Sequence, residues 1–166
     1  PFILLNLLSF LGLCLLAWYC TKRLPEVPGW FIWIWLMTAP WTLNFSTHVV
    51  NPSYVLTGAI LFFIGFLETC PYTSKHLISN RLANLMMGLS LFWVMQLHLS
   101  WTILVPYVCV SLFFQLRSSR ENFIRSLVCF ALGALLTGSL LVPTFLKFGL
   151  QEGLGGTGTA AVINIG

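Results

Sequence analysis

The sequence predicts an all-α fold: a polytopic integral membrane helix bundle with about six transmembrane spans. Composition is the first reason, because 58% of the 166 residues are hydrophobic and only 7% are charged, whereas a soluble domain has about 25% charged residues. So few charges cannot cover a surface that faces water. The distribution of charge is the second reason, because seven of the eight lysines and arginines fall in three short gaps between apolar runs.

These basic gaps predict which side of the membrane each connection occupies. They lie at residues 22–23, 75–81 and 117–125, and the gaps between them contain no lysine or arginine until Lys147. An excess of basic residues in every second connection is typical of cytoplasmic loops. The net charge of +4 is spread over membrane-edge loops, so we expect a lipid bilayer and no nucleic acid as the partner.

The first three spans follow from apolar runs and the residues that interrupt them. At 1.5 Å per residue, a helix over 1–21 is about 31 Å long, which matches the hydrocarbon core. The second span, about 28–45, contains four tryptophans, which we expect to form part of an interfacial belt. The third, 52–69, begins at Asn51 and Pro52, a favourable pair for a helix N-cap and first turn.

The remaining three spans are predicted in the same way. The fourth covers about 82–98. The fifth, 101–116, contains a proline and barely reaches across a bilayer, so we expect it to be kinked or partly buried in protein. Ser118 and Glu121 have the spacing of a capping box at the start of the sixth span, which runs to about residue 146.

Small residues recur four apart in the sixth span, as Gly133-x-x-x-Thr137 and Ala134-x-x-x-Gly138. Such spacing allows close helix packing, which we expect within the chain rather than at a dimer face. We assign 1–148 to the transmembrane domain and 149–166 to the start of an extracytoplasmic Gly-rich loop. The glycines of that loop superficially match a dinucleotide fingerprint, but the required strand and helix on either side are missing.

The five cysteines sit mostly inside apolar runs, without CxxC or Cys/His ligand spacing. We interpret them as small packing residues rather than as metal ligands or a disulfide framework. The sequence therefore predicts no metal site and no cofactor. Because the chain opens inside an apolar stretch with no charged segment before it, we expect it to be a piece of a longer membrane protein.

Polar residues collect on the predicted outer face, and four of them are candidate substrate-binding residues: His48, Asn51, Gln96 and His98. Polar side chains at membrane depth tend to face a protein interior or a wet cavity. Gln96 and His98 would point roughly 200° apart on one helix, so they can share a cleft only if the helix ends between them. The alternative is an ordinary hydrated helix end. Lys147 is either an interfacial anchor or a ligand for a phosphate head group.

Two stretches, TAPWTLNFSTHVVNPSYVL at 38–56 and GLSLFWVMQLHLS at 88–100, precede a short proline-containing span, a basic loop and an ALGA segment that ends at Pro143. This layout resembles bacterial multi-span glycosyltransferases of the GT-C type over roughly residues 1–148. That group includes dolichyl-phosphate-mannose protein mannosyltransferases and aminoarabinose lipid A transferases. The resemblance implies an enzyme of the bacterial inner membrane that transfers a sugar from a polyprenyl-phosphate donor to a lipid, glycan or protein acceptor on the extracytoplasmic face.

The resemblance also implies where the catalytic residue lies. In that family the general base is an acidic residue of the first outer loop, between the first and second spans. The first span of this chain is predicted to run inward, like the family's second span, so we expect the first span and the catalytic acid to lie outside this fragment. Three of the four glutamates map to the cytoplasmic side, and Glu152 does not match the family's motif.

Two other functions stay open from the residues. A transporter segment would place ionisable residues in the middle of spans, and none lies there. A non-catalytic membrane subunit fits the composition equally well, but it does not require the outer polar cluster.

Overall fold

The computed structural model describes residues 2–40, 55–71, 76–143 and 146–147. These ranges are helical and contain no strand, which confirms the all-α prediction. The helices are α1 (Phe2–Arg23), α2 (Gly29–Thr38), α4 (Val55–Thr69), α5 (Asn80–Leu97), α6 (Trp101–Ser118) and α7 (Arg120–Gly138), followed by the 3-10 helix η2 (Ser139–Leu141).

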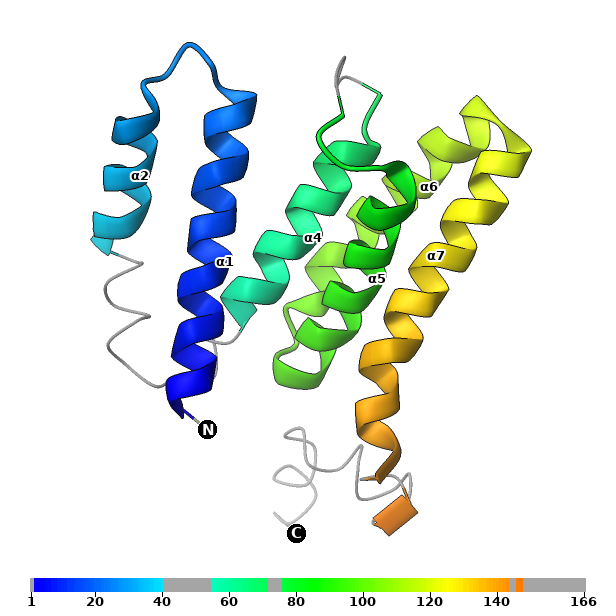
Figure 1. Cartoon of the computed structure of the whole chain (residues 1–166). Helices are drawn as coiled ribbons and strands as arrows, with labels where there is room; N and C mark the ends of the chain where they lie inside the picture. Colours follow the sequence, from blue (N-terminus) through cyan, green and yellow to red (C-terminus); the bar gives the residue numbers. More distant parts are fainter. Residues whose placement is uncertain (1, 41–54, 72–75, 144–145, 148–166) are drawn as a thin grey trace, which may run out of the picture.

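Successive helices alternate in direction, so that helix ends far apart in the sequence lie at the same end of the molecule (Figure 1). One end, here called the basic end, contains the C-termini of α1 and α6 and the N-termini of α5 and α7. Its cationic side chains are Lys22, Arg23, Arg81, Arg117, Arg120 and Arg125. The opposite end contains the junction of α5 and α6. The basic gaps, which alternate with uncharged gaps along the sequence, therefore lie together at one end of the molecule.

Two helical segments in the described part of the chain are long and apolar enough to cross a membrane, Trp101–Ser118 and Arg120–Leu141. The second segment includes η2, so the α-helix of the predicted sixth span tightens into a 3-10 turn after Gly138. The other apolar helices, α2 and α4, have 10 and 15 residues, fewer than the roughly 20 of a full crossing.

The second predicted span is not a continuous helix over 28–45. Helix α2 ends at Thr38, and Ala39 adopts φ −57° and ψ 136°. The ring of Pro40 disfavours helical geometry in the residue before it, which explains this break. Pro28, the first residue of the predicted second span, instead stands just before the helix with φ −54° and ψ 126°.

The predicted capping box of Ser118 and Glu121 is also wrong. Helix α6 continues through Ser118, and extended Ser119, with φ −165° and ψ 136°, separates it from α7 without a side-chain cap. The Glu121 carboxylate instead accepts a hydrogen bond from Arg125, one turn further along α7. A salt bridge at this spacing satisfies the carboxylate within its own helix.

Helices α5 and α7 pack together through glycines. A Cβ added at Gly133 would overlap the carbonyl oxygen of Leu85, and one at Gly88 would overlap that of Phe130. The hydroxyl of Thr137 donates a hydrogen bond to the Leu89 carbonyl across the same interface, at 3.1 Å. The small-residue spacing predicted from sequence therefore supports close packing inside the chain, as expected.

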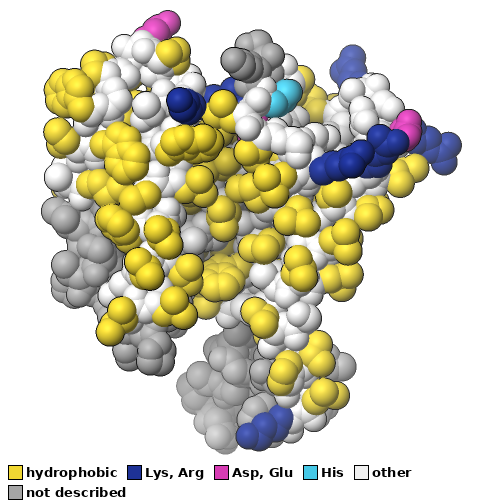
Figure 2. All heavy atoms as spheres, viewed as in Figure 1, with side chains coloured by type: hydrophobic (Ala, Val, Ile, Leu, Met, Phe, Trp, Pro, Cys, Tyr) yellow, Lys and Arg dark blue, Asp and Glu magenta, His cyan; other side chains and the backbone are white. Residues whose placement is uncertain are grey.

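The main apolar core lies where α4, α5 and α6 meet. It is formed by Phe62, Met87, Leu91, Val94, Leu104 and Val108. Large apolar side chains also cover much of the outer surface, including Ile103 of α6 and Leu135 of α7, which are 65% and 68% exposed. Figure 2 shows this apolar surface below the cationic side chains of the basic end.

Candidate functional site

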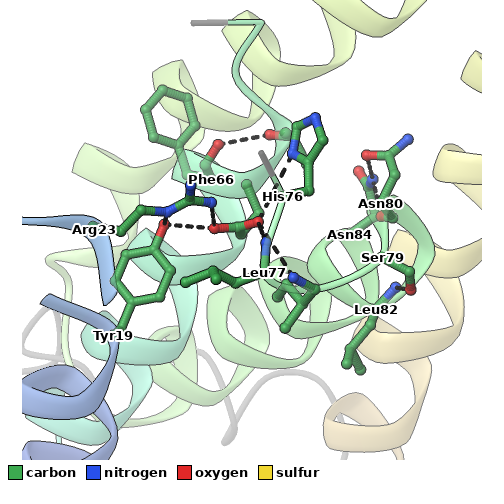
Figure 3. Close-up of polar contacts among 12 residues, drawn as sticks. Tyr19, Arg23, Phe66, His76, Leu77, Ser79, Asn80, Leu82 and Asn84 are labelled. Atoms are coloured by element: carbon green, nitrogen blue, oxygen red, sulfur yellow. Dashed lines mark hydrogen bonds and ion pairs between the residues drawn. The ribbon is translucent and has the colours of Figure 1, made fainter. Parts of the chain in front are cut away.

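The most extensively partnered ionisable side chain, Glu68, lies at the basic end, in the last turn of α4 (Figure 3). Its carboxylate is fully buried. One oxygen, Oε1, accepts hydrogen bonds from the Arg23 guanidinium and, at 2.8 Å, from the Tyr19 hydroxyl. Tyr19 and Arg23 are one turn apart on α1, so a single helix face supplies both donors. This ion pair joins α1 to α4.

The second Glu68 oxygen, Oε2, is bound by the segment before α5. The backbone N–H groups of Leu77 and Ile78 donate to it at 2.8 and 3.4 Å, and the Nδ1 atom of exposed His76 lies 3.8 Å away (Figure 3). Both carboxylate oxygens are therefore occupied by protein groups. A buried carboxylate with this many donors is suited to fixing local structure, and neither oxygen is left for a reacting group.

A second buried network connects α5 with α6. Asn84 and Gln115 exchange two side-chain hydrogen bonds, both 3.1 Å long, and Gln115 also donates to Ser111 at 2.9 Å. The amide of Asn80 donates to Gln115 and to Ser126 of α7, at 3.2 Å each. Such polar pairs hold helices together where apolar contacts alone do not specify a neighbour.

A cavity of about 240 Å³ lies between these two networks, with Glu68, His76, Asn80 and Gln115 among its lining residues. The charge pattern of the sequence places these residues on the predicted cytoplasmic side, but it does not predict that they meet. Two signals were nevertheless present. Antiparallel spans bring Arg23 and Glu68 to the same level, and the pairs Asn80/Asn84 and Ser111/Gln115 each have one-turn spacing.

Two of the four predicted site residues lie at the opposite end. Helix α5 ends at Leu97, and His98 follows in extended geometry with φ −159° and ψ 147°, so the helix does end between Gln96 and His98. The Gln96 amide donates to the Thr137 carbonyl at 2.8 Å. His98 is exposed, and its Nδ1 accepts a hydrogen bond from the Ser100 N–H at 3.1 Å.

The structure therefore gives Gln96 and His98 different surroundings. Gln96 bridges α5 and α7, which is a structural role, whereas His98 is exposed and its ring accepts a local hydrogen bond from Ser100. No hydrogen bond joins these two side chains in the part of the chain that the structure describes. His48 and Asn51 lie outside the described residues, as does the loop 149–166, so the predicted convergence of all four on one cleft stays a prediction.

Metal-binding side chains and thiols are further candidates for chemistry. Within residues 2–40, 55–71, 76–143 and 146–147, no three His, Cys, Asp or Glu side chains lie close enough together to hold a metal ion. All five cysteines are free thiols. Cys70 is buried, and Cys109 is exposed on α6.

Comparison of the chain with protein-family models, curated proteins and solved structures finds no match.

Proposed function

We propose that this chain is the membrane-embedded part of a GT-C-like glycosyltransferase, with the basic end at the cytoplasmic surface and the substrate site at the opposite, extracytoplasmic end. The single observation on which the orientation depends is the gathering of the cationic ends of α1, α5, α6 and α7 at one end of the molecule. Positive charge of this kind is retained on the cytoplasmic side of membrane proteins.

The apolar outer surface supports embedding of the whole bundle. Trp30, Ile103 and Leu135, on three different helices, are each at least 65% exposed. Monomeric soluble proteins rarely expose contiguous apolar surface of this extent. In a bilayer, lipid tails cover such side chains, and helices satisfy their own backbone hydrogen bonds. The bundle is then polytopic, with the partial helices α2 and α4 at the positions of the second and third spans.

The opposite end offers polar groups that a substrate could use. His98 is exposed there, and the nearby Ser100 hydroxyl is buried without a hydrogen-bond partner among the described residues. Sugar transfer needs a base for the acceptor hydroxyl and donors that stabilise the charge of the departing lipid phosphate. His98 can supply one such donor. The proposed substrate is a polyprenyl-phosphate sugar, because the layout that includes the stretches 38–56 and 88–100 resembles that of glycosyltransferases using this donor.

Orientation is tested by single-cysteine labelling in a variant that lacks the five native cysteines. Leu99 is 75% exposed at the opposite end, and Ser119 lies between α6 and α7 at the basic end. We expect a membrane-impermeant maleimide added to intact spheroplasts to label Leu99→Cys, but to label Ser119→Cys only after permeabilisation. Equal accessibility of both positions from outside would refute the orientation.

The site is tested by replacing His98 in the full-length protein. Loss of a group that stabilises developing charge lowers turnover by about 100-fold or more, so His98→Ala should slow transfer of radiolabelled sugar from polyprenyl phosphate at unchanged membrane yield. Thr102→Ala is the matched control, because Thr102 is also exposed at this end and its hydroxyl donates to the Leu99 carbonyl in the adjoining turn. Turnover unaffected by His98→Ala would remove His98 from the site.

A non-catalytic membrane subunit is the second candidate. It is favoured by the fact that the best-partnered polar side chains, Glu68, Asn84 and Gln115, hold helices together at the basic end. Absence of any sugar transfer by the full-length protein, together with co-purification of a defined partner, would select this function over the glycosyltransferase.

A further inference from the structure

A second polar pocket, of about 380 Å³, opens at the basic end between the first turns of α5 and α7. It is lined by Ser79, Asn80, Arg81, Asn122, Arg125 and Ser126. Two guanidinium groups, two amides and two hydroxyls therefore surround it, and no carboxylate is part of the lining. The two guanidinium groups give the pocket a net positive charge and hydrogen-bond donors that match an oxyanion.

The two arginines have donors to spare. Arg81 is exposed and has no ion-pair partner among the described residues. Arg125 pairs with Glu121, but both side chains are more than half exposed, so water screens that pair strongly. Each guanidinium has five N–H donors in a planar fork. A phosphate group can therefore be bound by both side chains without breaking a buried interaction.

The floor of the pocket is held rigidly. The Asn80 amide is fixed by its hydrogen bonds to Gln115 and Ser126, both 3.2 Å long, and its side-chain oxygen accepts from Asn84 at 3.1 Å. Four side chains from three helices thus hold the base of the pocket in one arrangement. Prior ordering of this kind lowers the entropic cost of binding.

Apolar surface continues directly below the pocket. Val128 and Leu132 follow Arg125 by about one and two turns on α7, and both are at least half exposed. Leu82, next to Arg81 at the start of α5, is 46% exposed. A ligand that combines a phosphate with hydrocarbon chains therefore fits this surface better than a free phosphate does.

We propose that this pocket binds the phosphate group of an anionic phospholipid in the leaflet at the basic end, with its acyl chains against the outer face of α7. Basic pockets between membrane helices on the cytoplasmic side recognise lipid head groups in this way. The site rests on the embedding of the bundle in a membrane, as proposed above, and it is independent of sugar transfer.

The test uses the purified full chain in an uncharged detergent, titrated by calorimetry with dihexanoyl phosphatidylglycerol, dihexanoyl phosphatidylcholine and inorganic phosphate. We expect saturable binding of the phosphatidylglycerol, at least about tenfold weaker binding of the other two, and at least about tenfold weaker phosphatidylglycerol binding by Arg81→Gln/Arg125→Gln. The control is Arg117→Gln/Arg120→Gln, which removes the same charge from the same end but leaves the pocket lining intact.

The outcomes separate the alternatives. Equal weakening by both double variants would overturn the pocket in favour of diffuse surface charge. Equally tight binding of inorganic phosphate would show a phosphate site without lipid specificity, and equally tight binding of phosphatidylcholine would show that the head-group charge is irrelevant; either result overturns the proposal.

If the arginine variant is not helical by circular dichroism, Asn122→Leu, which fills the pocket and keeps its charge, must show the same loss of phosphatidylglycerol binding. Because no step measures sugar transfer, failure here leaves the glycosyltransferase proposal untouched.

Discussion

The two ends of the helix bundle differ in how their polar side chains are partnered. At the basic end, Glu68 and Gln115 are buried, and each makes hydrogen bonds to several protein groups, including side chains of another helix. At the opposite end, Gln96 makes one hydrogen bond to a neighbouring helix, and His98 is exposed. Among the described residues, the more extensive polar networks therefore lie at the end that the glycosyltransferase proposal places away from the substrate.

This difference teaches how to interpret polar residues in an apolar chain. A polar side chain buried among apolar helices costs free energy unless its hydrogen bonds are made inside the protein. Closed networks such as that of Glu68 therefore fix helix positions, whereas an exposed, sparsely bonded group such as His98 is available for a ligand. A polar side chain's hydrogen-bond partners, rather than its polarity alone, therefore indicate whether its role is structural or functional.

The largest expected effect comes from breaking the ion pair at the basic end. Glu68→Ala leaves the Arg23 guanidinium, only 19% exposed, without its carboxylate. Removing one member of a buried ion pair costs about 3–5 kcal/mol, so the free energy of unfolding, measured by denaturant titration in detergent micelles, should fall by that amount. Loss of helix packing between α1 and α4 should accompany it.

The matched control for this prediction is Glu121→Ala. Glu121 also pairs with an arginine, but its side chain is 71% exposed, and exposed pairs one helical turn apart contribute only about 0.3–0.5 kcal/mol. If both variants lost similar stability, burial would not determine how much these ion pairs stabilise the fold. The contrast between buried, fully bonded polar groups and exposed ones would then be contradicted.

A smaller effect is expected at the interface of α5 and α7, which joins the two ends. Gly133→Ala places a methyl group against the Leu85 carbonyl, which belongs to the backbone and cannot rotate away. Overpacking of this kind costs about 1–3 kcal/mol, and the same unfolding titration measures it.

Gly138→Ala is the control on the same helix. Its nearest neighbour would be the Phe92 ring at 3.6 Å, an ordinary contact distance, and alanine is the better helix former by about 1 kcal/mol. Stability should therefore stay unchanged or rise. A loss at Gly138 equal to that at Gly133 would mean that helix α7 does not pack on α5 through Gly133.

Much of the helix arrangement could be predicted from sequence, because apolar runs and their breakers are local signals. The span expected at 101–116 corresponds to α6, Trp101–Ser118, and that expected at 82–98 corresponds to α5, Asn80–Leu97. The break at Ala39 is local too, since Pro40 determines it. The hydrophobicity of the surrounding tryptophans hides this signal when the apolar run is taken as one span.

The partners of buried polar residues could not be predicted so directly. Their identity depends on which helices pack together and at what rotation, and these are properties of the whole fold. The one-turn spacing of Asn80 and Asn84 indicates a polar stripe, but not that Gln115 faces it. For Gln96 and His98, the condition predicted from sequence, a helix end between them, is met, but the hydrogen bond from Gln96 to Thr137 could not be predicted.

The last prediction makes the same substitution, glutamine to leucine, at each end of the bundle. The expected difference in stability between the two variants is the smallest of those predicted. Gln115→Leu leaves the buried Asn84 amide without its reciprocal partner, and an unsatisfied buried polar group costs about 1–3 kcal/mol. Gln96→Leu removes a single hydrogen bond from a half-buried site, and interhelical hydrogen bonds in membrane proteins average only about 0.6 kcal/mol. The two variants change the same side chain to the same product, so hydrophobicity and helix propensity nearly cancel between them. A greater loss of stability for Gln96→Leu would reverse the contrast between the ends and assign the structural polar network to the end where the substrate site is proposed.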